Sequence, residues 1–276
     1  MINYNGALID SDAVLSNSNR GFLYGDGIFE TLKIVNSKIV FFEDHYFRLM
    51  ASMRIVRMKI PTNFTQEFLE EQIINLAKAN LCENSARIRF TVFRNDGGFY
   101  LPKNRDVSYL IQAHKLENQK YSTDFLNYEV ELYKDFFISN QLLSTLKSTN
   151  KMINITGSIY ADENGFQNCL LLNNEKNVVE ALNGNVFMLH NNTLITPPIT
   201  DGCLNGILRK QVLNLAKTNE TIAFIEKSIS PFDLQKADEL FITNVISGIV
   251  PITKYRKKVY STAFALHLQN QLNLAF

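Results

Sequence analysis

The stretch Leu142-Leu143-Ser144-Thr145-Leu146-Lys147-Ser148-Thr149-Asn150 sets a single lysine among leucines. We expect it to be the end of an extended, apolar segment that turns into a helix. A cation is costly inside a domain, so burial would lower the pKa of Lys147 and favour its neutral amine. A neutral amine attacks aldehydes and other carbonyls. The alternative is that Lys147 ends a strand and extends its amine to solvent.

A carboxylate follows in Val179-Glu180-Ala181-Leu182-Asn183-Gly184-Asn185-Val186-Phe187. Glu180 would end an apolar strand, with Asn185 placed after a small polar loop. A carboxylate in such a position is costly unless a cationic or protonated group pairs with it. The alternative is an exposed glutamate on a surface turn.

Two further features could bind an anion. A helix is expected to begin at Asn205, so the N–H groups of Gly206, Ile207 and Leu208 would point out of its N-terminus, which favours phosphate. Asn205 as a simple N-cap explains the same residues. Arg48 stands among apolar and aromatic neighbours on another predicted helix. Its planar fork could hold a phosphate, or it could form an ordinary salt bridge at the surface.

Thr243 and Asn244 end a predicted strand that then turns through Ser247-Gly248. Hydroxyl, amide and backbone donors would meet at this point. Polar residues are common at strand ends, so this pattern alone has no specific meaning.

Hydrophobic periodicity predicts helices and strands in irregular succession. No regular βαβ repeat appears, so an α+β protein with two lobes is expected. The polar stretch 117–124 lacks apolar periodicity and is interpreted as a linker. It separates a smaller N-terminal α/β domain (1–118) from a larger C-terminal domain (125–276). Expected elements near the candidate residues are a loop over 17–27, hairpin strands over 28–35 and 38–42, and helices over 43–58, 65–79, 151–164 and 205–217.

The composition excludes several classes of partner. The 276 residues carry a net charge of +1, which gives no electrostatic reason to expect nucleic acid or an anionic membrane. No apolar run reaches the length of a membrane span. The first six residues lack the pattern of a signal peptide. Three widely spaced cysteines suggest free thiols in the cytoplasm, and neither they nor the four scattered histidines predict a metal site.

Together these features supply what pyridoxal 5′-phosphate requires. Its aldehyde needs a lysine, its pyridine nitrogen needs an acid, and its phosphate needs an arginine and a helix N-terminus. Their order along the chain, between Arg20-Gly21-Phe22-Leu23-Tyr24-Gly25-Asp26-Gly27-Ile28-Phe29-Glu30 and Gly248-Ile249-Val250-Pro251, resembles the class IV aminotransferase family. These are the fold type IV pyridoxal-phosphate enzymes, which include the D-amino-acid aminotransferases.

The resemblance implies two domains with the cofactor between them, and a homodimer. Lys147 matches the catalytic lysine that binds the cofactor aldehyde. Glu180 matches the partner of the pyridine nitrogen, in a Glu-x4-Asn-x-Phe pattern that includes Asn185. The remaining matches lie on the phosphate side of the cofactor: Arg48, Gly206, Ile207, Leu208, Thr243 and Asn244.

The resemblance is greatest to the 4-amino-4-deoxychorismate lyases, through Phe29-Glu30-Thr31-Leu32 and Thr243-Asn244-x4-Ile249-Val250-Pro251. D-amino-acid aminotransferases carry a tyrosine where Phe29 stands and a histidine beyond Arg94 that is absent here. Branched-chain aminotransferases place a tyrosine at the position of Met152. We therefore expect a lyase of folate biosynthesis that converts a small-molecule amine substrate, 4-amino-4-deoxychorismate, to 4-aminobenzoate and pyruvate. Arg94 is expected to bind a carboxylate of that substrate. The alternative is an aminotransferase acting on branched-chain or D-amino acids.

Overall fold

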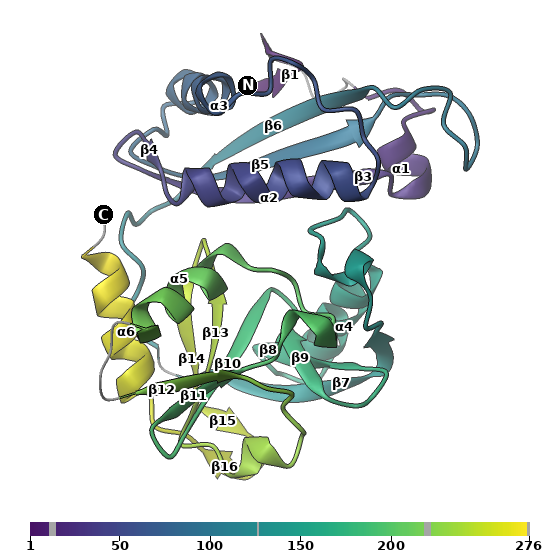
Figure 1. The fold of residues 1–276 in the computed structure, drawn as a ribbon. Coiled ribbons are helices and arrows are strands. Elements are labelled where there is room, and N and C mark those ends of the chain that lie inside the picture. The colour runs from purple at the N-terminus through teal and green to yellow at the C-terminus, as the bar shows by residue number, and fades with distance from the viewer. Residues whose placement is uncertain (11–14, 126, 218–221, 275–276) are drawn as a thin grey trace. The chain divides into compact units, whose positions relative to one another are not determined.

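The computed structural model describes residues 1–10, 15–125, 127–217 and 222–274. The chain forms two compact units (Figure 1). Unit 1 comprises 1–119 together with Lys147–Asn150, and unit 2 comprises 120–146 and 151–276. The chain first passes from unit 1 to unit 2 within the stretch interpreted as a linker. The segment that contains the candidate lysine belongs to unit 1, although its sequence neighbours belong to unit 2.

Unit 1 is built on a six-stranded antiparallel sheet in the order β2-β1-β6-β5-β3-β4. Its strands are β1 (Ile2–Tyr4), β2 (Ala7–Ile9), β3 (Gly27–Val35), β4 (Lys38–Ile39), β5 (Ser85–Arg94) and β6 (Val107–Lys115). Its helices are α1 (Arg20–Tyr24), α2 (Phe42–Ile55) and α3 (Gln66–Ala79).

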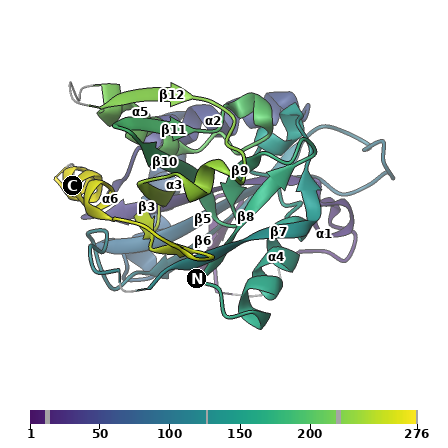
Figure 2. The same ribbon diagram turned by 90° about the horizontal axis from the view of Figure 1, so that it is seen from below.

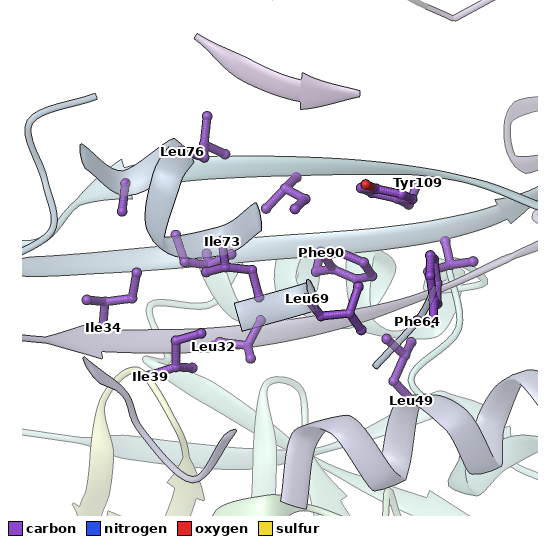
Figure 3. Packing of buried hydrophobic residues seen from close by; sticks show 14 of the residues in the cluster. Leu32, Ile34, Ile39, Leu49, Phe64, Leu69, Ile73, Leu76, Phe90 and Tyr109 are labelled. Carbon is purple, nitrogen blue, oxygen red and sulfur yellow. The ribbon is translucent and has the colours of Figure 1, made fainter. Parts of the chain in front are cut away.

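The core of unit 1 lies between one face of this sheet and helices α2 and α3. Strand alternation sends Ile28, Leu32 and Ile34 of β3 to this face, where they meet Leu49 of α2 and Ile73 of α3 (Figure 3). The same alternation assigns the odd-numbered side chains of β3 and β5 to the opposite face. That opposite face carries Phe29 and Arg89, whereas Glu30 of β3 points towards α2, whose His45 and Arg48 it contacts.

Two predictions for unit 1 are corrected by the structure. The expected loop 17–27 contains the short helix α1, because Asn19 accepts a hydrogen bond from the N–H of Phe22 and Gly25 ends the helix in a left-handed conformation. The second strand expected over 38–42 is only β4, since the backbone turns left-handed at Phe41 and α2 follows at once.

Unit 2 is built on a ten-stranded mixed sheet. The main order is β12-β11-β10-β9-β8-β7-β15-β16, and β13 pairs with both β10 and β14. Its strands are β7 (Glu129–Ile138), β8 (Asn168–Asn173), β9 (Val178–Ala181), β10 (Gly184–His190), β11 (Thr193–Thr196), β12 (Ala223–Glu226), β13 (Glu239–Asn244), β14 (Gly248–Ile252), β15 (Lys254–Tyr255) and β16 (Lys258–Val259).

Three α-helices pack on this sheet: α4 (Met152–Glu163), α5 (Ile207–Lys217) and α6 (Ala263–Asn273). Figure 2 shows α4 beside β7 and β8, with which it is in contact. The buried Glu239 caps α6, because its carboxylate accepts hydrogen bonds from the N–H groups of Phe264 and Ala265. Short 3₁₀ helices occupy Leu142–Thr145, Ile199–Asp201 and Asp233–Gln235. None of the described helices is long and apolar enough to cross a membrane.

The extended conformation expected before Lys147 is wrong. Strand β7 ends at Ile138, and Leu142–Thr145 forms a 3₁₀ helix. Hydroxyl groups explain the difference, because Thr145 donates to the carbonyl of Leu142 and Ser144 donates to that of Ser139. Such local bonds compete with a strand ladder.

Candidate active site

Lys147 is held at the edge of β3 by backbone pairing. The N–H of Phe29 donates to the carbonyl of Lys147 at 2.8 Å, and the N–H of Thr149 donates to Gly27 at 3.0 Å. Ser148 lies opposite Ile28 in an antiparallel bridge. Lys147 therefore lies beside Phe29, and its backbone cannot move without breaking these two hydrogen bonds.

Two cations share the ring of Phe29. The Nζ atom of Lys147 is 4.6 Å from the ring centroid, and the guanidinium carbon of Arg89 is 3.7 Å from it. Arg89 comes from β5, where it lies opposite Thr31 of β3. Cations are attracted to the face of an aromatic ring. The arrangement places an amine and a guanidinium group next to the same apolar surface.

Arg48 is fixed by a buried carboxylate. Its Nε and Nη2 atoms both donate to Glu30 of β3, and Nδ1 of His45 lies 2.7 Å from the same carboxylate. Burial alone would raise the pKa of Glu30, but the Arg48 charge and the His45 hydrogen bond hold it at about 2. Burial lowers the pKa of His45, which favours the neutral ring with Nδ1 as donor. The guanidinium of Arg48 is thus held in one orientation.

Arg94 does not fit the role expected for it. All three of its guanidinium nitrogens are used within unit 1: Nε donates to Asp26 at 2.9 Å, Nη1 to the carbonyl of Arg57 and Nη2 to that of Val56. Asp26 also accepts from Arg20. Arg94 therefore joins the end of β5 to the loop that contains Asp26 and to the turn after α2, and its guanidinium group is not free for the substrate carboxylate that was expected.

Three candidate residues of unit 2 lie on one cross-strand row. Glu180 of β9 lies opposite Asn185 of β10, and Asn185 lies opposite Thr243 of β13. Directly opposed residues point to the same face of a sheet. All three side chains are buried. The fold therefore brings together the acid, the amide and the hydroxyl that stand far apart in the sequence.

Glu180 and Asn185 hold the turn that leads into α5. The carboxylate of Glu180 accepts from the N–H of Leu204 at 2.8 Å, and Nδ2 of Asn185 donates to the carbonyl of Leu204 at 2.7 Å. The buried hydroxyl of Thr243 has no hydrogen-bond partner among the residues that the structure describes. An unpaired buried hydroxyl is costly and suggests a partner that binds there.

The beginning of α5 differs in two respects from the prediction. The helix begins at Ile207 and not at Asn205. The N–H of Gly206 donates to the carbonyl of Leu204 at 2.9 Å, so it is not an available donor. For Ile207 and Leu208, the described part of the chain supplies no acceptor for the backbone N–H groups. Gly206 has a steric role instead, because an added Cβ would lie 1.9 Å from Oδ1 of Asn185.

Asn244 shapes the turn after β13. Its Oδ1 accepts from the N–H groups of Ile246 and Ser247, at 3.1 and 2.9 Å. Gln269 of α6 supports the same turn, because its Oε1 accepts from the N–H of Ile249. These contacts fix the loop beside Thr243.

Three residues of unit 1 that shape the site were given no role from the sequence: Glu30, His45 and Arg89. One signal was available for two of them, because Glu30 and Arg89 are charged residues inside strongly apolar strands. Charged side chains in such strands are rarely placed there for packing. The sequence around His45, by contrast, contains no pattern that would indicate its role.

Comparison with known proteins identifies the family of this chain. The family model described as amino-transferase class IV matches residues 27–255. A protein of Methanocaldococcus jannaschii, provisionally named a branched-chain-amino-acid aminotransferase, is 29% identical over 265 residues, covering 90% of this chain and 85% of that one. The D-alanine aminotransferase of Bacillus licheniformis is 27% identical and covers 91% of this chain and 86% of its own.

A solved structure from Legionella pneumophila, provisionally named a 4-amino-4-deoxychorismate lyase, superposes with a TM-score of 0.81 at 25% identity. It covers 95% of this chain and 97% of its own. The two-unit α+β architecture is that of the fold type IV enzymes. The chain belongs to the class IV aminotransferase family and is a pyridoxal-phosphate-dependent enzyme.

Proposed function

We propose that this enzyme is a lyase that converts 4-amino-4-deoxychorismate to 4-aminobenzoate and pyruvate. The observation that carries the proposal is the ring of Phe29, which is shared by the amine of Lys147 and the guanidinium of Arg89. A substrate with an amine and a carboxylate on one compact ring suits this pairing. Arg89 takes the place of Arg94 as the contact for a substrate carboxylate.

The residues fit the cofactor on structural grounds. Unit 2 offers a phosphate group the backbone N–H groups of Ile207 and Leu208 at a helix N-terminus, where the dipole favours an anion. The hydroxyl of Thr243 is buried and lacks a described partner, as a phosphate-binding donor should before the ligand binds. Gly206 allows the side chain of Asn185 to lie close to the start of α5, because a Cβ at residue 206 would clash with Oδ1 of Asn185.

Arg48, Glu180, Asn185 and Asn244 complete the proposed set. Arg48 would bind the phosphate from an orientation that Glu30 fixes. Glu180 would hold a proton on the pyridine nitrogen, because a carboxylate beside that nitrogen stabilises its protonated form. Asn185 keeps the α5 entry in place through Leu204, and Asn244 keeps the turn beside Thr243 in place.

When bound, pyridoxal 5′-phosphate supplies an aldehyde that takes up the substrate amine and a ring that withdraws electrons from the amine-bearing carbon. Nζ of Lys147 removes the proton from that carbon as a general base. The electrons of the broken C–H bond expel the enolpyruvyl oxygen from the adjacent carbon, and the substrate ring becomes aromatic. The departing enol gains a proton and becomes pyruvate, so the elimination balances without another reactant.

Three sequence features count against amino-group transfer. Phe29 stands where D-amino-acid aminotransferases have a tyrosine, the run after Arg94 lacks the histidine of those enzymes, and Met152 stands where branched-chain aminotransferases have a tyrosine. The second candidate function is transfer of an amino group from a branched-chain or D-amino acid, favoured by the names of the two curated relatives.

We also propose a homodimer in the cytoplasm. Phe99, Tyr100 and Leu101 form a loop tip that is more than 80% exposed at each residue, and the ring of Tyr100 lies 6.0 Å from that of Tyr24, tilted at 60° to it. A contiguous exposed apolar surface favours association, and a second copy is the simplest partner. The three cysteines are buried free thiols, which suits a reducing compartment. Light scattering of the purified enzyme, and of a Phe99→Ser/Tyr100→Ser variant that should be monomeric, tests the dimer.

The deciding experiment is to incubate the purified enzyme, loaded with cofactor, with 4-amino-4-deoxychorismate and to measure 4-aminobenzoate. Product that Lys147→Ala fails to form supports the lyase. Absence of product, together with a change in cofactor absorbance when amino acids alone are added, would replace the lyase with the aminotransferase.

A further inference from the structure

The face of the unit 1 sheet opposite helices α2 and α3 carries a cross-strand row of basic residues beyond Arg89. Arg87 of β5 lies opposite Lys33 of β3 on one side and opposite His114 of β6 on the other. Arg87 and Arg89 are two residues apart on one strand, so both belong to this face. The opposite face is the apolar core shown in Figure 3.

This row opposes the stability of the sheet. Like charges placed directly opposite each other on neighbouring strands are destabilising. Arg87 and Arg89 are half-buried, and burial together with the nearby Arg87 charge lowers the pKa of Arg89. Within the described ranges, no carboxylate pairs with either guanidinium and no acceptor takes a hydrogen bond from it. Arg89 is stabilised where it lies because its guanidinium group stacks on the ring of Phe29. Within the described residues, no such contact stabilises the guanidinium group of Arg87.

We propose that Arg87 binds a second carboxylate of the substrate and thereby makes the site selective for dicarboxylates. This inference rests on the proposed function, which assigns the substrate amine to Lys147 and its first carboxylate to Arg89. Two residues of strand advance by roughly 6–7 Å. A substrate of the size of one six-membered ring with two carboxylate arms spans that separation. Binding of a dianion would neutralise the two neighbouring guanidinium groups.

An aliphatic substituent of a substrate would bind poorly beside Arg87 and Arg89. An apolar group placed against two guanidinium groups would remove water from them without offering an acceptor. A carboxylate accepts two parallel hydrogen bonds from one guanidinium, a geometry that lysine cannot offer. Arg87 is therefore a specificity-determining residue, and replacement by lysine should recover only part of its effect.

Binding to the cofactor-free protein provides the first test. Isophthalate and benzoate differ by one carboxylate, and their dissociation constants can be measured by calorimetry for wild type, Arg87→Gln and Arg87→Lys. Wild type should bind isophthalate about 10–100-fold more tightly than benzoate. Arg87→Gln should reduce this ratio to near one, and Arg87→Lys should lie between the two. Arg54→Gln, which removes an exposed arginine of α2, is the matched control and should keep the full ratio.

Equal affinity of wild type for the two compounds, or an unchanged ratio in Arg87→Gln, would overturn the proposal. Inorganic phosphate that competes as well as isophthalate would also overturn it, because the site would then be a general anion site. The melting temperature of each variant verifies folding.

Steady-state kinetics separates this inference from the proposed function. With 4-amino-4-deoxychorismate, Arg87→Gln should raise KM about 10–100-fold and leave kcat within about threefold. A fall in kcat as large as the rise in KM would indicate a structural role for Arg87 and contradict the inference. Failure of the wild-type enzyme to form 4-aminobenzoate would instead contradict the lyase, while the isophthalate ratio would still decide the role of Arg87.

Discussion

The carbonyl of Lys147 accepts a hydrogen bond from the N–H of Phe29, and the amine of the same lysine lies 4.6 Å from the centre of the Phe29 ring. One residue of β3 therefore fixes both ends of the lysine. The backbone bond sets where the side chain starts, and the ring limits where its amine can go. This explains how a lysine that follows a 3₁₀ helix in unit 2 is positioned by a strand of unit 1.

Replacement of Lys147 by alanine should abolish turnover and leave the fold intact. The backbone bonds of residue 147 do not depend on its side chain, whereas the proposed reaction has no other base at that position. We expect kcat to fall by at least about 1,000-fold, with a melting temperature within a few degrees of wild type. Lys38→Ala, which removes an exposed lysine of β4, should keep full activity. Appreciable turnover by Lys147→Ala would disprove the assignment.

The Glu30 carboxylate should make stability depend on pH below about 4.5. Its pKa in the folded protein is about 2, compared with 4.5 for an unperturbed glutamate. Because the folded value is depressed, the stabilisation is fully present above the unfolded pKa and is lost as pH falls from about 4.5 towards 2. The contribution is on the order of 3 kcal/mol. Urea unfolding of wild type and Glu30→Gln between pH 2.5 and 7 should show it.

Glu30→Gln should be less stable at pH 7 by about 3–5 kcal/mol, because the buried Arg48 charge loses its partner. The gap between the two proteins should narrow as the pH falls. A constant gap across this range would show that Glu30 acts through packing and not through its charge.

The two buried hydroxyls of Thr243 and Thr196 should respond in opposite ways to replacement by valine. Thr243 has no described hydrogen-bond partner, whereas Thr196 donates to the carbonyl of Val186 at 2.8 Å. Thr243→Val should leave the cofactor-free protein as stable as wild type or more so, and should weaken cofactor binding about tenfold. Thr196→Val should cost about 1 kcal/mol of stability and leave cofactor affinity unchanged. Chemical denaturation and equilibrium dialysis of the cofactor measure the two effects, and equal affinities for the two variants would exclude Thr243 from the phosphate site.

Much of the fold could be predicted because it depends on local signals. The helices over 42–55 and 66–79 and the strand over 27–35 follow from hydrophobic periodicity, and their positions differ from the expected ones by a few residues. The assignment of Lys147 to unit 1 could not be predicted, because it depends on pairing with β3 far away in the sequence. The role of Arg94 was missed for the same reason, since Asp26 and two distant carbonyls hold it. The 3₁₀ helix before Lys147 was missed because hydroxyl-to-backbone bonds outweighed the apolar pattern.

Gly206 should tolerate no side chain unless Asn185 is shortened. A Cβ at residue 206 would lie 1.9 Å from Oδ1 of Asn185, whose amide also holds Leu204. Gly206→Ala alone should cost roughly 1–3 kcal/mol, because the amide must move and release its hydrogen bond. In an Asn185→Ala background the clash is gone, and alanine restricts the unfolded chain more than glycine does. The same Gly206→Ala change should then be neutral or stabilising by up to about 1 kcal/mol. Denaturation of the four proteins of this double-mutant cycle measures the coupling, and equal costs in the two backgrounds would show that the Asn185 contact does not determine the need for glycine.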